Sequence, residues 1–318
     1  DTKTLTGLIK VIKEKNPTYS PLALYFIIDN GLTDDKDQIN EYFDILIEDT
    51  PLEEYKIKGR SVWVKRDDLM GDGVHLPPWG KMAAIYQLVD KYVDKSKPLT
   101  HLSVDGSWSG WTLAAICEDL GIEFYYSHPN SKKISKELLG MVKEKYPYCK
   151  FNPIRPNMMS IMYNSLKKQA REEGWQMLPY AFNHDFYMDY LSERIQPYTH
   201  FKNLVVSSGS GVSLSGLAKG YFREELKEFW SQTDKTIYTT CVSSESSINK
   251  MLKNNGLAQL PIKVRKSEYD FDNRMEDYET PFPCNQFWDI KQWKWLEENI
   301  ENIEGDILFW NIGGIYKF

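Results

Sequence analysis

Residues 205–216 have the sequence VVSSGSGVSLSG, which follows an apolar run from Phe201 and leads into a segment with helical spacing from Leu217. A strand that ends in small residues and restarts as a helix leaves several backbone N–H groups facing one concavity, beside the positive end of the helix dipole. Glycines let an anion approach the main chain closely, and serines add uncharged hydroxyl donors. The stretch therefore predicts either a phosphate site or an ordinary Ser/Gly-rich connection in an α/β domain.

The spacing of the glycines differs from two common nucleotide motifs. Neither G-x-G-x-x-G nor G-x-x-x-x-G-K-[ST] fits residues 205–216. A dinucleotide-binding fold and a Walker-type nucleotide site both lose support on this ground.

Length and composition are those of a globular protein. The 318 residues, 42% hydrophobic and 26% charged, can bury a large core in one or two domains. A net charge of −6 argues against sequence-independent binding to a nucleic-acid backbone. Because no apolar run has membrane-spanning length and residues 1–15 lack the apolar centre of a signal peptide, we expect a cytoplasmic protein without a membrane partner. The 4 cysteines form no C-x-x-C pair, so we expect reduced thiols and no metal site.

Strands and helices alternate along most of the chain. The expected strands are 61–65, 101–104, 122–127, 149–154, 178–181, 203–207, 236–243 and 306–311, and the expected helices are 82–92, 111–120, 134–145, 159–172, 185–195, 215–230 and 287–299. Residues 244–279 show no regular pattern and are expected to be irregular. Helices of this length between strands predict parallel sheets covered by helices.

The alternation predicts an α/β fold with two lobes, each with a mainly parallel sheet. We expect an N-terminal helical layer at residues 1–50, a large lobe from residues 51–81 and 179–318, and a smaller inserted lobe at residues 82–178. Ligands of open parallel sheets bind at the carboxyl ends of the strands. The active site is therefore expected between the lobes.

Lys81 follows a loop rich in glycine and proline and opens the helix expected at 82–92. A lysine held away from bulk water can have a lowered pKa and act as a nucleophilic amine, although an exposed first-turn lysine has the same local pattern. A cofactor that carries both an aldehyde and a phosphate needs a lysine for the first and neutral donors for the second. Lys81 and residues 208–216 together indicate pyridoxal 5′-phosphate (PLP).

The chain resembles the fold-type-II PLP-dependent enzymes, and among them the branch of aminocyclopropane-carboxylate deaminase and D-cysteine desulfhydrase. The similar landmarks run in the family's order and are TPLE at 50–53, VKRDDL at 64–69, GK at 80–81, SGSG at 208–211, GLA at 216–218, LFW at 308–310 and GG at 313–314. The resemblance implies that Lys81 binds PLP as an aldimine. It implies further that the phosphate is held by Ser208, Gly209, Ser210, Gly211, Val212 and Ser213.

The segment FWDIK at 287–291 resembles the family's V-Y-(E/T)-G-K, which would place Asp289 at the pyridine nitrogen. An acid there keeps the ring protonated and favours chemistry through a quinonoid carbanion. A solvated position on an amphipathic helix is the alternative for Asp289. Trp288 stands where the deaminase has a tyrosine, so acid–base work by that phenol is lost.

Other departures from the family fall near the substrate. Gly80 replaces an asparagine that touches the ring oxygen of PLP, and Ser107-Trp108-Ser109 replaces the Ser-Asn-His that holds a substrate carboxylate. We expect this trio and Trp288 to contact a substrate that differs from those of the family. A carboxylate in an apolar setting favours decarboxylation, because desolvation raises its ground-state energy.

The sequence thus predicts a PLP-dependent lyase that acts on an amino-acid-like substrate through Lys81, by deamination, β-elimination or decarboxylation. A narrower alternative is a decarboxylase of an amino acid attached to a nucleobase, as in DNA viruses that hypermodify thymine. Two further alternatives are a catalytically silent scaffold with the same fold and a protein that binds another phosphorylated metabolite. The resemblance also implies a homodimer.

Overall fold

The structure is a computed structural model that describes residues 50–315, except for 72, 74, 75, 105, 131–135, 228–232, 271 and 272. The helical layer expected at residues 1–50 lies outside the described residues, apart from Thr50. Within the described part, no helix combines the length and the apolar character needed to cross a bilayer.

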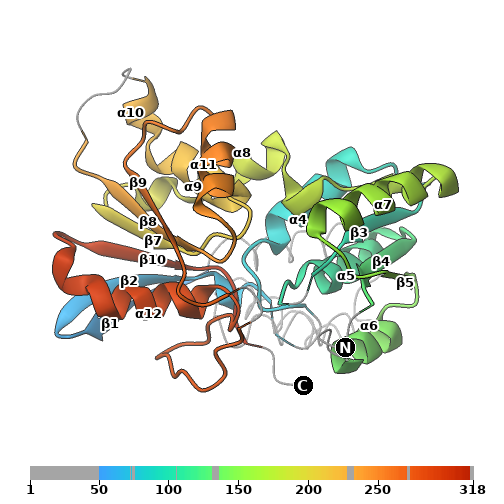
Figure 1. The fold of residues 1–318 in the computed structure, drawn as a ribbon, viewed down its shortest axis with the longest axis horizontal. Helices are drawn as coiled ribbons and strands as arrows, with labels where there is room; N and C mark the ends of the chain where they lie inside the picture. Colours follow the sequence, from blue (N-terminus) through green and yellow to red (C-terminus); the bar gives the residue numbers. More distant parts are fainter. Residues whose placement is uncertain are drawn as a thin grey trace, which may run out of the picture.

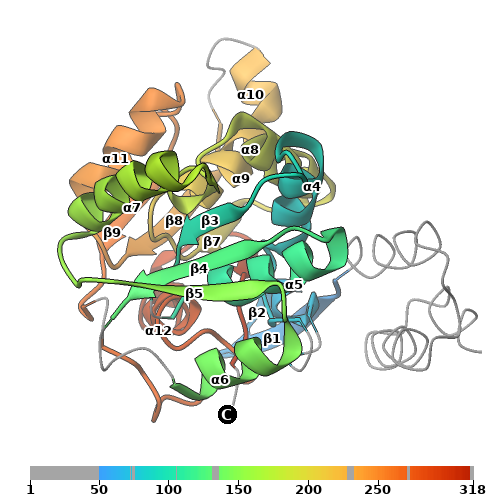
Figure 2. The same cartoon turned by 90° about the vertical axis from the view of Figure 1, so that its right-hand side faces the viewer.

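Two sheets with their helices form the two lobes of the molecule (Figures 1 and 2). The larger sheet has the strand order β1-β2-β10-β7-β8-β9, and the smaller sheet has the order β5-β4-β3-β6. Only β1 and β2 pair in an antiparallel way among these strands. The predicted α/β class with two mainly parallel sheets is confirmed.

The strands of the larger sheet are β1 (Leu52–Ile57), β2 (Arg60–Arg66), β7 (Asn203–Val206), β8 (Thr236–Cys241), β9 (Ile262–Lys266) and β10 (Ile307–Asn311). Those of the smaller sheet are β3 (Leu99–Leu102), β4 (Phe124–Pro129), β5 (Cys149–Ile154) and β6 (Gln176–Met177). The helices are α4 (Met82–Tyr92), α5 (Ser109–Leu120), α6 (Lys136–Lys145), α7 (Met159–Glu173), α8 (Asp185–Arg194), α9 (Val212–Tyr221), α10 (Arg223–Lys227), α11 (Glu245–Asn254) and α12 (Asp289–Asn299).

The central strands of the larger sheet are apolar on both faces, because helices cover both sides. Leu204 and Val206 of β7 pack into the cluster that contains α8 and α9. Val205 points the other way, into the cluster that contains α12. In Figure 1, α12 accordingly runs along one face of this sheet, while α8, α9 and α11 lie on the other. Because successive side chains of a strand point to opposite faces, the sheet and the helices on its two faces form a three-layer lobe.

The smaller sheet is assembled from residues 99–177 and is covered in the same way. Leu99 of β3 packs with residues of α5 and α6, whereas Leu102 packs with Met162 and Leu166 of α7. Helices α4 and α8 connect the two lobes and lie between them in Figure 1.

Two segments fold differently from what their sequence predicts. Residues 244–279, expected to be irregular, contain α11 and β9. The helix begins where the Ser244 hydroxyl accepts a hydrogen bond from the Ser247 amide, and it buries Ile248 and Leu252 on one face. Strand β9 lies at the edge of the sheet and exposes basic side chains, so it has few core positions. The strand expected at 178–181 is instead the 3-10 turn Tyr180–Phe182.

The expected helix at 215–230 is also divided differently. It starts earlier, at Val212, and gives way to α10 after Phe222. The left-handed φ of 87° at Gly211 ends the loop, so α9 begins directly after it. Residues 228–230 of the expected helix lie outside the described residues.

Candidate active site

A cavity of about 280 Å³ lies at the carboxyl ends of strands from both sheets. The larger lobe contributes Ser207, Gly209, Ser210, Val242, Asp289 and Ile312 to its wall. The smaller lobe and its connections contribute His101, Leu102, Ser107, Ser109, Met159 and Phe182. Lys81 and Trp79, which join the lobes, complete this part of the wall.

The backbone before α4 places Lys81 in the cavity. The Gly80 amide donates to the Ile312 carbonyl over 2.7 Å, and Trp79 forms a bridge with Gly313, so the chain is pinned to the end of β10. The Lys81 ammonium lies 5.3 Å from the centre of the Trp79 ring. Burial lowers the pKa of Lys81 to about 8, against an opposing attraction by the Asp289 carboxylate. Near neutral pH such an amine can gain or lose a proton readily, as a nucleophile or base requires.

Asp289 is the first residue of α12 and is only 2% exposed. Its Oδ1 accepts hydrogen bonds from the Ser207 hydroxyl at 2.7 Å and the Ile312 amide at 3.4 Å, and its Oδ2 accepts from the Gly313 amide at 3.1 Å. These three donors are neutral, and burial raises the pKa of Asp289 to about 7. A cationic ligand group beside this carboxylate would supply the charge that favours its ionised form.

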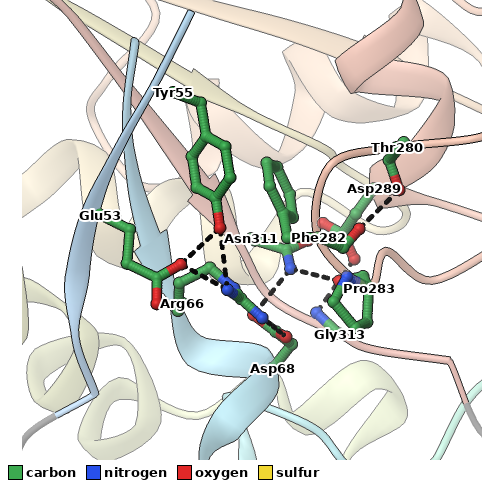
Figure 3. Close-up of polar contacts among 10 residues, drawn as sticks. All are labelled: Glu53, Tyr55, Arg66, Asp68, Thr280, Phe282, Pro283, Asp289, Asn311 and Gly313. Atoms are coloured by element: carbon green, nitrogen blue, oxygen red, sulfur yellow. Dashed lines mark hydrogen bonds and ion pairs between the residues drawn. The ribbon is translucent and has the colours of Figure 1, made fainter.

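A buried polar network supports the backbone that carries Asp289 and Gly313 (Figure 3). Arg66 at the end of β2 pairs with Asp68 over 2.8 Å and also reaches Glu53 on β1. Asn311, at the end of β10, donates over 2.8 Å both to Asp68 and to the Pro283 carbonyl. The network joins β1, β2 and β10 to the loop before α12, which fixes the carboxyl ends of these strands relative to Asp289.

Only some of the residues predicted to hold the phosphate line the cavity. Gly209 and Ser210 line the cavity, together with Ser207, which the sequence analysis did not select. The Ser213 hydroxyl lies 3.0 Å from the Tyr187 hydroxyl, behind the cavity wall.

The remaining predicted phosphate ligands do not line the cavity; they are Ser208, Gly211 and Val212. The Ser208 hydroxyl is buried and has no hydrogen-bond partner among the described residues, and Val212 is 1% exposed. Helix α9 starts at Val212, and the first amides of a helix have no partner within it. An anion at this end of the cavity would therefore be held mainly by backbone N–H groups.

Of the three consecutive residues 107–109 predicted to contact the substrate, the two serines line the cavity and the tryptophan does not. Ser107 and Ser109 line the cavity, and their hydroxyls form a chain of hydrogen bonds with Ser103, at 3.0 Å and 3.1 Å. The Trp108 ring packs edge-on against Trp111 at 6.1 Å and is not part of the described cavity wall. The expected contact of the Trp108 indole with substrate therefore has no geometric support.

Trp288 lines the cavity and joins the two lobes. Its Nε1 donates to the Gly106 carbonyl over 3.3 Å. Its ring also covers Gly209 so closely that a Cβ there would lie 2.8 Å from the ring carbon Cζ3. The tryptophan thus fixes the width of the cavity beside the Ser/Gly loop.

Two glycines near the cavity leave no room for a side chain. A Cβ at Gly80 would lie 2.4 Å from the Cβ of Asp67, which is itself held by Arg194 and Trp310 at 2.8 Å each. A Cβ at Gly110 would lie 2.0 Å from the ring of Tyr126. An asparagine cannot be accommodated at Gly80 without moving Asp67.

Several residues of the wall were not predicted from the sequence, above all His101 and the turn at Tyr180–Phe182. Ala181 and Phe182 have φ values of 54° and 59°, which is the left-handed region that side chains other than glycine rarely adopt. No sequence signal marks such a turn. A histidine at the carboxyl end of a buried strand was a usable signal for His101.

Comparison with known proteins agrees with this geometry. No family model matches the chain. A curated protein of Pseudomonas phage M6, named glycyl-dTMP PLP-dependent decarboxylase, is 27% identical over 285 residues, which span 85% of this chain and 100% of that protein. A solved ACC deaminase homologue has a TM-score of 0.62 at 15% identity over 84% of this chain and 90% of its own. Maize serine racemase has a TM-score of 0.56 at 14% identity over 85% of this chain and 90% of its own.

The chain has the fold of the fold-type-II PLP-dependent enzymes. The fold implied by the sequence motifs is thereby confirmed, and the likeness to the phage protein relates the chain to an enzyme that is PLP-dependent by name. The residues of the cavity fit this cofactor of the fold-type-II enzymes. A lysine with a lowered pKa, a buried carboxylate with neutral partners and a loop of serines and glycines at a helix start meet in one cavity.

Proposed function

We propose that the chain is a PLP-dependent decarboxylase whose substrate is an amino acid joined to a pyrimidine nucleotide. The observation that carries the proposal is the meeting of Lys81, Asp289 and the Ser/Gly loop in one cavity. The substrate class is supported by the phage relative, whose name specifies a glycyl group on dTMP and whose whole length aligns with this chain.

Each end of PLP has a matching group in the cavity. Lys81 would bind its aldehyde carbon, Asp289 would accept a hydrogen bond from its protonated ring nitrogen, and the amides around Ser210 would hold its phosphate. When bound, PLP supplies an electron sink for the pair released as the bond between Cα and the carboxylate breaks. The protein's own task is then to orient that bond and to move one proton.

The environment of the substrate carboxylate favours loss of carbon dioxide. Among the described residues that line the cavity, Lys81 is the one cationic side chain, and the cofactor would occupy it. The carboxylate would instead meet uncharged groups, such as the hydroxyls of Ser107 and Ser109, the Asn285 amide and the apolar side chain of Leu102. A carboxylate that lacks a cationic partner in a desolvated site is raised in energy relative to a transition state in which its charge disperses.

Lys81 is also placed to complete the reaction. The site must deliver one proton to Cα, where the carboxylate was attached. Because its pKa is lowered to about 8, the protonated Lys81 can donate that proton from Nζ near neutral pH, and the resulting neutral amine takes up another proton from water.

The test is product analysis with PLP-saturated protein and glycyl-dTMP as substrate. We expect a product lighter by one carbon dioxide, detected by mass spectrometry, and a loss of at least about a thousandfold in rate for Lys81→Ala. Lys91→Ala is the matched control, because Lys91 is an exposed lysine on the same helix. Release of ammonia instead of carbon dioxide, or an unchanged substrate with PLP bound, would contradict the proposal.

A further inference from the structure

His101 is a buried polar residue of the cavity wall that the proposed chemistry does not use. It is the third residue of β3, pairs with Tyr126 of the neighbouring strand and is 3% exposed. It lies in the smaller lobe, whereas Asp289 and the Ser/Gly loop lie in the larger one. It therefore reaches the cavity from a different lobe than Asp289 and the Ser/Gly loop.

The His101 imidazole lacks the partner that a buried polar group normally has. Its Nδ1 is inaccessible to solvent and has no hydrogen-bond partner among the described residues. Most buried polar side-chain atoms in proteins do have one. Since the ring forms part of the cavity wall, Nε2 on its other edge is the nitrogen left to meet a ligand.

The neighbours of His101 hold its ring in one orientation. It stacks on Phe182, with 4.5 Å between the ring centres and 14° between the planes. Phe182 also meets the edge of Trp79 at 6.4 Å. The strained backbone at Ala181 and Phe182 is of the kind that persists where a functional site needs it. The ring is thus positioned in advance for a ligand.

The protonation state of His101 makes it a neutral donor toward the cavity. Burial lowers the pKa of His101 to about 3, so the ring is uncharged at neutral pH. Buried N–H groups without an acceptor are rarer than buried acceptors without a donor, which favours the tautomer with hydrogen on Nε2 rather than on the enclosed Nδ1. A neutral N–H in an apolar wall suits a carbonyl oxygen better than a phosphate, because it brings no compensating charge.

We propose that His101 is a specificity residue, which donates a hydrogen bond from Nε2 to a ring carbonyl of the pyrimidine joined to the amino acid. The inference rests on the proposed function, because that function supplies the pyrimidine. It adds that the smaller lobe recognises the base through His101, held by Phe182, while the larger lobe holds the cofactor.

The test is equilibrium binding of dTMP to PLP-saturated protein, followed by calorimetry. We expect His101→Phe to weaken dTMP binding by roughly tenfold, and His101→Gln, whose amide can place a donor near Nε2, to stay within about threefold of wild type. Binding of 2-deoxyribose 5-phosphate, which lacks the ring, should be the same for all three proteins. His128→Phe is the control, since His128 is a buried histidine on the adjacent β4 whose Nδ1 already contacts the Pro129 carbonyl at 3.0 Å.

The outcomes separate this inference from the proposed function. Unchanged dTMP binding by His101→Phe, or equal weakening with the ring-free phosphate, overturns the role of His101 even if glycyl-dTMP still loses carbon dioxide. Loss of binding in His101→Gln to the same degree as in His101→Phe also overturns it, because a donor at that place would then have no effect. A His101-dependent affinity for dTMP supports the inference even if no decarboxylation is found.

Discussion

Burial of single charged groups determines the chemistry of the cavity. Asp289 and Lys81 influence each other, yet the larger effect on both is removal from water, which raises the pKa of the acid to about 7 and lowers that of the amine to about 8. Both groups can therefore change protonation near neutral pH, whereas an ordinary aspartate and lysine cannot. Titratable groups with perturbed pKa values that lie together in a cavity are typical of catalytic sites.

The raised pKa of Asp289 predicts how stability without cofactor depends on pH. The folded protein keeps a proton on Asp289 that the unfolded chain releases between about pH 4 and 7, so the free energy of unfolding falls as the pH rises through this window, by about 4 kcal/mol at most. In Asp289→Asn this loss is absent. The Tm of the variant minus that of the wild type should therefore increase from pH 5 to pH 8, as measured by calorimetry.

The control for this prediction is Glu173→Gln, which removes an exposed carboxylate at the end of α7. Its Tm difference from wild type should stay constant over the same pH range. An Asp289→Asn difference that is equally constant would show that Asp289 is ionised in the folded protein at low pH.

Single side chains also account for what the sequence could not predict about the site. Lys81 and Asp289 were found because their order along the chain matches a known set of landmarks. The orientation of Trp108 toward Trp111 depends on the packing of the smaller lobe, and local sequence contains no information on it. The wall residues at Tyr180–Phe182 were missed for a related reason, since their left-handed backbone is imposed by tertiary contacts.

At the scale of elements, the loop before α4 is shaped by one close approach. Gly80 packs on Asp67 of the 3-10 turn after β2, and Asp67 is in turn held by hydrogen bonds from Thr50, Arg194 and Trp310. The side chain of Asp67 cannot retreat without losing these bonds. Gly80 therefore couples β2 and the turn at Asp67 to the start of α4, where Lys81 lies.

Gly80→Ala should destabilise the protein by about 1–3 kcal/mol, because the new methyl group would overlap Asp67. It should also reduce PLP uptake, because the overlap displaces Lys81. The measurement is urea denaturation together with titration of PLP absorbance.

The matched control is Gly140→Ala in α6, where an added Cβ meets no atom within 4 Å. This exchange should stabilise the protein by about 0.5–1 kcal/mol, as alanine does in an exposed helix. A Gly80→Ala protein as stable as wild type would mean that the packing on Asp67 is looser than the distances indicate.

Most elements were predictable because apolar segments alternate with glycine, proline and polar turn residues along the chain. Helix α4 has the predicted bounds, and β2, β3, β4, β5, β7, β8 and β10 lie within a few residues of expected strands. Strands β1 and β9 were not expected, and the strand expected at 178–181 is a turn. Helix α11 has a usable signal that the sequence prediction did not apply, because Ile248 and Leu252 lie on one buried face after the cap at Ser244. Strand β9 was missed because an edge strand with exposed basic residues contains few core positions. Its formation depends on β8, to which it pairs.

In the whole molecule, the cavity is lined by residues of both lobes, and each lobe contributes different groups. The larger lobe provides Asp289 and the Ser/Gly loop, the smaller lobe provides His101 and the serine hydroxyls, and Trp288 bridges them through Gly106. A ligand that contacts both walls would stabilise the folded state as a whole, by linkage.

PLP should therefore raise the Tm of the wild type. At about a hundred times its Kd, a ligand adds about 2.7 kcal/mol, which corresponds to roughly 4 °C in a protein of this size. Pyridoxine 5′-phosphate, which lacks the aldehyde, should give a smaller shift, and Lys81→Ala should respond equally to both compounds. Identical shifts with the two compounds in the wild type would argue against a bond to Lys81.

The proposed chemistry depends on binding of PLP by the amine of Lys81 within this cavity. The most direct measurement is reduction of the PLP-loaded protein with borohydride, followed by proteolysis and mass spectrometry of the peptides. The account predicts one pyridoxyl-modified peptide, which contains Lys81 and is absent from the Lys81→Ala protein. Modification of other lysines with Lys81 left free, or no modified peptide from a protein saturated with PLP, would contradict it.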